Sequence, residues 1–125
     1  MSSILLIEDD ELFREALADA LTERGFTVTQ AADGAQGVKL FHAEPTDLVL
    51  TDIVMPNKDG TAAVADLRRD FPSFGIIAMS GGAANNPALY LKIAGALGAN
   101  RTLKKPFSLP MLLATMEEVL AAGSD

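Results

Sequence analysis

Short apolar runs alternate with longer amphipathic patterns along the chain. Residues 4–7 (ILLI), 48–50 (LVL) and 76–79 (IIAM) are continuous apolar runs, which are typical of strands buried on both faces of a sheet. Residues 27–30 (TVTQ) alternate polar and apolar positions, as an edge strand does, and residues 102–104 form a short fifth run. The pattern therefore predicts five short strands, three of them buried on both sides.

Apolar side chains recur at helical spacing in the segments that follow these strands. Residues that begin or end helices stand at the borders of these segments, namely Gly25, Asp33, Gly34, Pro45, Pro72 and Gly98. The apolar positions of the five predicted helices are Leu12, Phe13, Ala16, Leu17, Ala20, Leu21, Val38, Phe41, Val64, Leu67, Leu89, Tyr90, Ile93, Leu97, Leu109, Leu112, Leu113, Met116 and Leu120. Five successive βα units predict an α/β domain with a doubly wound, five-stranded parallel sheet.

Composition and charge exclude several classes of protein. The 125 residues fit one domain, and a hydrophobic content of 49 % excludes a disordered tail. The formal net charge of −7 is the opposite of the basic face that nucleic-acid-binding domains carry. No apolar stretch has the length of a membrane span, and acids follow the first apolar run at once, which excludes a signal peptide. The lack of cysteine excludes thiolate chemistry and fits a reducing, cytoplasmic compartment.

Polar side chains stand where four of the predicted strands end. They are Glu8 and Asp9 after the first strand, Asp52 at the end of the third, Ser80 at the end of the fourth and Lys105 after the fifth. Ligands of open parallel sheets bind beyond the carboxyl ends of the strands, where the strand order reverses. We therefore expect these five side chains to lie together at one edge of the sheet.

The expected cluster contains three carboxylates, which must be protonated or neutralised because each close pair costs about 4 kcal/mol at a partly solvated site. Mg²⁺ is a natural neutraliser, since it binds carboxylates, water and phosphate oxygens, and Lys105 would add a second positive charge. A carboxylate nucleophile beside a metal ion and an ammonium group suits phosphoryl transfer. Ser80 can donate a hydrogen bond to a phosphoryl oxygen.

Four segments resemble motifs of the receiver domain of response regulators, the phosphoacceptor part of two-component signalling. Residues 4–11 (ILLIEDDE) are similar to the family's first strand and acidic pair, and residues 47–60, which read DLVLTDIVMP and end in DG, resemble its phosphorylation motif. Residues 76–81 (IIAMSG) resemble the strand that ends in Ser or Thr, and residues 103–107 (LKKPF) resemble its Lys-Pro-Phe motif. The resemblance runs from about Ser3 to the end of the last predicted helix and implies the flavodoxin-like strand order 2-1-3-4-5.

The resemblance implies roles for the acids of the cluster. Asp52 would accept a phosphoryl group from a phosphohistidine of a sensor histidine kinase or a histidine phosphotransfer protein. Asp9 and Asp52 would bind Mg²⁺ directly, the backbone carbonyl of Val54 would be another ligand, and Glu8 would act through water. The family's acidic pair falls on Glu8 and Asp9 rather than on Asp10. Such a domain promotes only its own phosphorylation and dephosphorylation and is not otherwise an enzyme.

The resemblance also implies that Ser80 and Lys105 hold the phosphoryl oxygens. In the family a cis peptide bond precedes the proline of the Lys-Pro-Phe motif, so the bond between Lys105 and Pro106 is expected to be cis. This is a sharp prediction, because only about 5–6 % of X-Pro bonds in folded proteins are cis.

The chain departs from the family pattern at positions connected with switching. Thr102 stands three positions before the lysine, where the family has Tyr or Phe, so the usual Ser/Thr–aromatic switch lacks its second partner. Residues 81–87 (GGAANNP) form a longer and more glycine- and asparagine-rich loop than usual, and we expect this loop to carry the signal. Val54 and Gly82 lack the polar side chains that could orient a hydrolytic water.

We interpret residues 1–125 as a single, stand-alone receiver domain, a monomer or weak dimer that binds a downstream protein differently when phosphorylated. The sequence leaves open a receiver module of a larger regulator or hybrid kinase, and a domain that drains phosphate from a kinase as a sink. An aspartyl phosphatase would need an acid at Val54, and a flavin binder would need a hydroxyl- and glycine-rich loop where residues 8–11 are acidic. His42 is far in sequence from every motif and is interpreted as a surface histidine rather than a phosphate relay.

Overall fold

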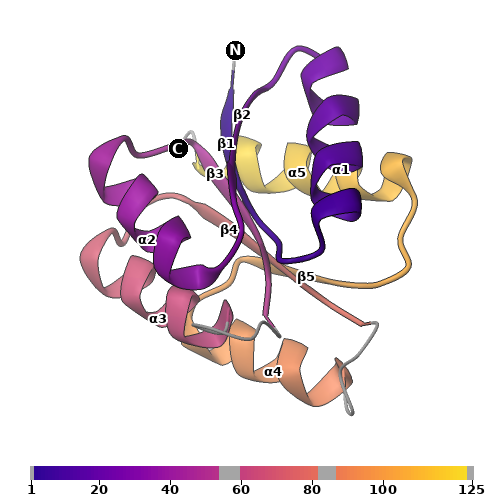
Figure 1. The fold of residues 1–125 in the computed structure, drawn as a ribbon. Coiled ribbons are helices and arrows are strands. Elements are labelled where there is room, and N and C mark those ends of the chain that lie inside the picture. Colours follow the sequence, from indigo (N-terminus) through magenta and orange to yellow (C-terminus); the bar gives the residue numbers. More distant parts are fainter. Residues whose placement is uncertain (1, 54–59, 82–86, 124–125) are drawn as a thin grey trace.

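The computed structural model describes residues 2–53, 60–81 and 87–123. Five strands in these residues form one parallel sheet in the order β2-β1-β3-β4-β5 (Figure 1). The strands are β1 (Ser3–Ile7), β2 (Thr27–Ala31), β3 (Leu48–Asp52), β4 (Gly75–Ser80) and β5 (Arg101–Lys104). The predicted fold class and strand order are therefore confirmed.

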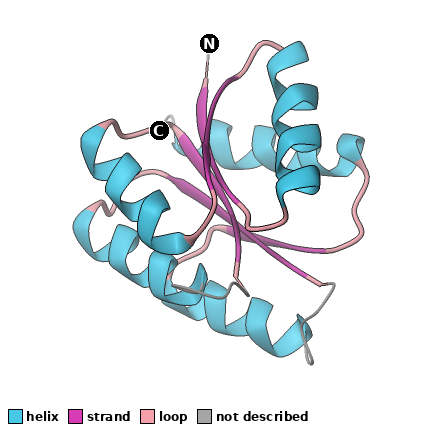
Figure 2. Cartoon of the chain, in the orientation of Figure 1, coloured by secondary structure: helices cyan, strands magenta, loops and turns pink. Residues whose placement is uncertain are grey.

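Helices cover both faces of this sheet, as Figure 2 shows. Figure 1 places α1 and α5 on one face and α2, α3 and α4 on the other. The helices are α1 (Glu11–Glu23), α2 (Gly34–Ala43), α3 (Gly60–Asp70), α4 (Pro87–Leu97) and α5 (Leu109–Gly123). This is the doubly wound arrangement that the alternation of strand and helix patterns predicts.

The hydrophobic core has two main layers, one on each face of the sheet. Successive side chains of β1 alternate between them: Ile4 and Leu6 belong to one layer, and Leu5 and Ile7 belong to the other. The first layer includes side chains of α1 and α5, namely Leu17, Ala18, Leu21, Leu112, Met116 and Val119. The second layer includes Phe41 of α2 and Val64 and Leu67 of α3. A strand buried on both faces needs apolar residues at every position, which explains the continuous apolar runs.

Two helices begin at aspartate caps. The carboxylate of Asp10 accepts a hydrogen bond from the backbone N–H of Phe13 at 3.2 Å, and that of Asp33 accepts one from the N–H of Gln36 at 2.8 Å. Such caps satisfy an N–H that has no partner inside the helix. Helix α4 ends before Gly98, whose φ of 123° is a conformation that favours glycine. The helix boundaries predicted at Asp33 and Gly98 are confirmed.

Only some of the apolar positions at helical spacing in α1 face the core. Leu12 is 81 % exposed and Ala16 is also exposed. The stripe that faces the core contains Phe13, Leu17 and Leu21, which are spaced four residues apart, and the adjacent Ala18. A helix that packs on one sheet buries only one such stripe, so the neighbouring apolar positions remain at the surface.

Helix α4 is present as predicted, but three of its larger apolar side chains are exposed. Ala94 is the buried residue that packs against Ala78 of β4. Leu89, Ile93 and Leu97 keep a large part of their surface in solvent. In the described part of the chain, no helix combines the length and the apolar character needed to cross a membrane.

The chain returns to the sheet at Gly60, directly beside the end of β3. The N–H of Gly60 donates to the carbonyl of Ile53 at 3.2 Å. A Cβ added to Gly60 would lie 2.1 Å from the carbonyl oxygen of Asp52 and 2.4 Å from the Cα of Ile53. Because only glycine permits this approach of two backbones, α3 can begin against the strand end that carries Asp52.

We predict opposite effects for two glycine-to-alanine substitutions. Gly60→Ala should lower the free energy of unfolding by about 2 kcal/mol or more, because the new Cβ would collide with backbone that must then move. Gly95→Ala should raise it by about 1 kcal/mol, since Gly95 lies inside α4 with open space at its Cβ position and alanine favours the helix. Urea denaturation of both variants measures the effects. Wild-type stability in Gly60→Ala would contradict the described backbone contact.

Candidate functional site

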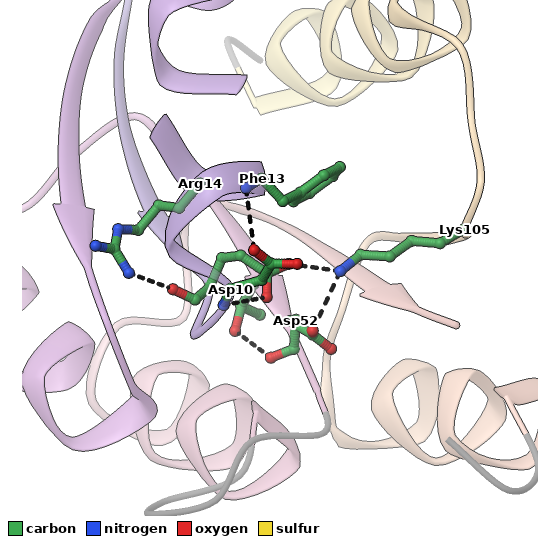
Figure 3. A network of polar contacts seen from close by, with 7 residues as sticks. Asp10, Phe13, Arg14, Asp52 and Lys105 are labelled. Carbon is green, nitrogen blue, oxygen red and sulfur yellow. Dashed lines mark hydrogen bonds and ion pairs between the residues drawn. The ribbon is translucent and has the colours of Figure 1, made fainter. Parts of the chain in front are cut away.

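The predicted acids meet at the carboxyl edge of the sheet. Glu8 and Asp9 follow β1, and Asp52 is the last residue of β3, the strand that pairs directly with β1. A carboxylate oxygen from each of the three lies within 4.8 Å of the others. Lys105 reaches the same place from the segment between β5 and α5 (Figure 3). Parallel pairing produces this meeting, because neighbouring strands end at the same edge.

The three carboxylates lie at different depths. Glu8 is 1 % exposed and Asp52 is 8 % exposed, whereas Asp9 is an exposed residue. The cluster is therefore buried at Glu8 and open to solvent at Asp9. A ligand that reaches Asp52 would also meet Asp9.

Lys105 supplies positive charge to the buried part of the cluster. Its Nζ donates to Oε1 of Glu8 at 2.5 Å and to Oδ2 of Asp52 at 3.2 Å. The lysine side chain is only 18 % exposed, so these charge-assisted hydrogen bonds lie in partly desolvated surroundings, where they are strengthened. Lys105 thereby holds together two buried acids that would otherwise repel each other.

The beginning of α1 also holds Glu8 in place, through Asp10 and Arg14. Oε2 of Glu8 accepts the backbone N–H of Asp10 at 3.2 Å, and its backbone carbonyl accepts Nη1 of Arg14 at 2.8 Å. Nε of Arg14 also donates to the side chain of Gln30 on β2 at 3.2 Å. The carboxylate of Asp10 is engaged in capping α1, so Glu8 and Asp9 are the acids of this run that join Asp52.

Ser80, the last residue of β4, brings a buried hydroxyl to this edge. Ser80 follows Met79, which is the register partner of Asp52. The residue is fully buried, and no group in the described residues forms a hydrogen bond with its Oγ. An unpaired buried hydroxyl costs about 1–3 kcal/mol. The site therefore contains a hydrogen-bond donor that an oxygen of a bound group could satisfy.

The backbone ties Ser80 to the lysine segment. The carbonyl of Ser80 accepts the N–H of Lys105 at 2.7 Å, and the peptide bond between Lys105 and Pro106 is cis, which confirms the prediction. The hydroxyl and the ammonium group therefore come from two segments that are fixed to each other.

The contact between Glu8 and Lys105 changes how both groups titrate. Burial raises the pKa of Glu8 to about 7, and the charge of Asp52 adds to this effect while the hydrogen bond from Lys105 opposes it. Burial by itself would lower the pKa of Lys105, but its hydrogen bond to Glu8 and the charges of Asp52 and Glu8 outweigh burial and raise it. At neutral pH the ammonium group of Lys105 stays charged. Glu8 is then close to its pKa, so its protonated and its charged forms are both populated.

The donor set fits a divalent cation of the Mg²⁺ type. The three clustered carboxylates offer hard oxygen ligands close enough to meet at one ion, and the exposed Asp9 leaves room for the water ligands that Mg²⁺ keeps. The further ligand predicted from sequence, the backbone carbonyl of Val54, lies outside the described residues. Gly82 and most of the predicted signalling loop, residues 82–86, lie outside them too.

Thr102 and His42 make their contacts elsewhere. Thr102 is exposed on β5, where it is the register partner of Ala78. Nε2 of His42 lies 2.9 Å from Oδ2 of Asp70, and its imidazole meets the ring of Phe71 at 5.0 Å between centroids. The prediction that His42 is a surface histidine is confirmed, since the residue is exposed.

Two residues of the site were not predicted from the sequence. Phe13 places its ring 4.5 Å from Nζ of Lys105, and Arg14 holds the carbonyl of Glu8. Both follow the acidic run within the first turn of α1 (Figure 3). Their position in the first turn after the Asp10 cap could have indicated that they lie at the site. The first turn of a helix that follows a strand lies at the carboxyl edge of the sheet.

A protein family and several named relatives match this chain in sequence. A model of the response regulator receiver domain family matches residues 4–117. The probable chemotaxis protein CheY of Rhizobium etli is 35 % identical over 120 residues, which cover 95 % of this chain and 92 % of that protein. The sensor kinase CckA of Brucella abortus is 35 % identical over 121 residues, which cover 95 % of this chain but only 12 % of the kinase. The chain thus spans nearly all of one relative and a small part of the other.

Solved structures share the fold. The CheY-like receiver domain protein of Methanospirillum hungatei superimposes with a TM-score of 0.89 at 24 % identity, covering 99 % of this chain and 97 % of that one. The response regulator TrrA of Thermotoga maritima, solved in complex with Mg²⁺-BeF, has a TM-score of 0.81 at 25 % identity, with coverage of 95 % and 99 %.

We predict that the metal-free chain loses stability as the pH rises from about 4.5 to about 7, and that Glu8→Gln removes this loss. Between these values the folded chain keeps a proton on Glu8 that the unfolded chain releases, so the folded state is penalised as the pH rises. The shift corresponds to about 3 kcal/mol. Urea denaturation in EDTA across this pH range measures the slope. The same slope in Glu8→Gln as in the wild type would show that Glu8 is not its source.

Proposed function

The chain belongs to the response regulator receiver domain family, and on that basis we propose that it accepts a phosphoryl group on Asp52 in a Mg²⁺-dependent reaction. One observation carries the proposal. The carboxylate of Asp52 lies 3.2 Å from the ammonium group of Lys105, at an edge where the buried hydroxyl of Ser80 has no partner among the described residues. An acid, a fixed cation and a free donor are the groups that an aspartyl phosphate needs.

Asp52 is the proposed nucleophile. One of its carboxylate oxygens would attack the phosphorus of a phosphohistidine, so that the O–P bond forms while the N–P bond breaks. The electron pair of the broken bond stays on the imidazole nitrogen, which takes up a proton from solvent. The product is an aspartyl phosphate on this chain and a free histidine on the donor.

Lys105 and Ser80 would hold the oxygens of the transferred group. Both stand on segments that the hydrogen bond between the carbonyl of Ser80 and the N–H of Lys105 fixes to each other. Donors that are fixed before the reaction stabilise the developing charge without reorganising. This arrangement supports a role in the transfer step as well as in holding the product.

Glu8, Asp9 and Asp52 would hold Mg²⁺, which supplies positive charge to the transferring phosphoryl group. Both carboxylate oxygens of Glu8 already accept hydrogen bonds, from Lys105 and from the N–H of Asp10, which favours a contact through water. Asp9 is exposed and suited to direct ligation. The TrrA structure, in which Mg²⁺-BeF is bound to a chain 25 % identical to this one, supports the choice of metal.

The proposed phosphodonor is a sensor histidine kinase or a histidine phosphotransfer protein in the cytoplasm. The relatives leave two settings for the same chemistry, a separate receiver like the Rhizobium etli CheY and a receiver segment like that of CckA. In either setting the output is a difference in affinity for a partner protein between the two phosphorylation states. A domain that serves only as a phosphate sink would show the phosphorylation without that difference.

We predict that acetyl phosphate and Mg²⁺ add one phosphoryl group, roughly 80 Da, to the wild type and to Asp10→Asn but not to Asp52→Asn. Asp10→Asn is the matched control, because asparagine preserves the helix cap while removing a neighbouring charge. Intact-mass spectrometry measures the gain, which should be stable in acid, labile in base and suppressed by EDTA. An equal gain in Asp52→Asn would refute the assignment of the acceptor.

A further inference from the structure

The ammonium group of Lys105 has a third neighbour besides Glu8 and Asp52. Its Nζ lies 4.5 Å from the centroid of the Phe13 ring, within the distance at which the negative face of an aromatic ring attracts a cation. In Figure 3 the Phe13 ring and the Asp52 carboxylate lie on opposite sides of the Lys105 amino group. The ring therefore lies on a different side of the ammonium group from the Asp52 carboxylate.

The surroundings strengthen this contact. The Lys105 side chain is mostly buried, and cation–π attraction increases when the cation is removed from water. The two carboxylates and the ring together limit the positions that the long lysine side chain can adopt. Lysine has four flexible side-chain bonds, so its amino group is not fixed unless neighbouring groups hold it.

The Phe13 ring is itself held in place. It meets the ring of Phe107 in a T-shaped contact, with 6.2 Å between centroids and an angle of 81° between planes. Both rings pack against the core layer between the sheet and helices α1 and α5. The backbone of Phe13 is also fixed, because its N–H donates to the Asp10 cap. A ring fixed in this way can act as a support rather than follow the lysine.

We propose that Phe13 is a positioning residue for phosphoryl transfer, whose ring face holds the Lys105 ammonium group beside Asp52 before the phosphodonor arrives. The inference rests on the proposed function of Asp52. A cation already in place at the reacting carboxylate need not be ordered during the reaction. An aliphatic side chain at residue 13 could fill the same space in the core, but it would lack the negative face that the ammonium group meets.

Stepwise fluorination of the Phe13 ring tests this role. Site-specific incorporation of mono-, di- and trifluorophenylalanine weakens the negative potential of the ring face while changing its shape little. The rate constant for phosphorylation of Asp52 by acetyl phosphate at saturating Mg²⁺ should fall with each fluorine, to about three- to tenfold below the wild type. Phe13→Leu should show a similar loss, and Phe13→Tyr should stay within about twofold of the wild type.

Phe26 provides the matched control, because it packs partly buried against the same core layer. The same fluorinated residues at Phe26 should leave the rate unchanged. Thermal unfolding of each fluorinated variant separates a loss of fold from a loss of rate, so the series remains informative even if Phe13→Leu does not fold.

A second measurement reads the contact without any reaction. The ε-methylene protons of Lys105 should resonate upfield in NMR spectra because of the ring current of Phe13, with the signal assigned through Lys105→Arg. The upfield shift should shrink along the fluorine series and disappear in Phe13→Leu.

The two measurements separate failure of this inference from failure of the proposed function. A wild type that is phosphorylated, with a rate unaffected by fluorination of Phe13, would overturn the positioning role and leave the proposed function intact. A wild type that gains no phosphoryl group would overturn the proposed function, and with it the role of Phe13 in phosphoryl transfer. The absence of an upfield Lys105 signal in the wild type would overturn the contact itself.

Discussion

The rest of the site depends on one constraint, the gathering of three carboxylates at one edge of a parallel sheet. Pairing of β1 with β3 brings Glu8 and Asp9 next to Asp52, and two of these acids are buried. Each close pair of like charges costs about 4 kcal/mol at such a site, so the cluster requires an opposing charge. Lys105, which is 97 positions from Glu8, provides it through hydrogen bonds to Glu8 and Asp52.

Lys105 offsets only part of the negative charge of the three acids, and the remaining charge favours binding of a cation. A single ammonium group faces three acids, and burial keeps a proton on Glu8 up to about pH 7. The hydroxyl of Ser80 is buried with no partner among the described residues. Excess negative charge and an unpaired donor both lower the stability of the free chain. A divalent cation would offset the excess negative charge, and a phosphoryl group on Asp52 would give the Ser80 hydroxyl a partner. The two core layers hold the strands that carry these side chains.

Much of the fold and of the site could be predicted from the sequence. Buried strands give continuous apolar runs, and strand ends are marked by the polar residues that follow them, so the meeting of Glu8, Asp52 and Lys105 followed from the topology. Contacts between individual side chains could not be predicted. The bond from Lys105 to Glu8 and the ring of Phe13 beside Lys105 depend on side-chain rotamers and on packing between distant segments. The exposure of Leu12 depends on which stripe of α1 meets the sheet, and periodicity alone allows two neighbouring stripes.

The most direct test of the central claim is a crystal structure of the chain with Mg²⁺ and beryllofluoride, which mimics a phosphoryl group on an aspartate. The account predicts the mimic on a carboxylate oxygen of Asp52, with the Ser80 hydroxyl and the Lys105 ammonium group donating to its fluorides. It also predicts Mg²⁺ in contact with Asp9 and Asp52. Beryllofluoride bound to another residue, or a Ser80 hydroxyl that still lacks a partner when Asp52 carries the mimic, would contradict the account.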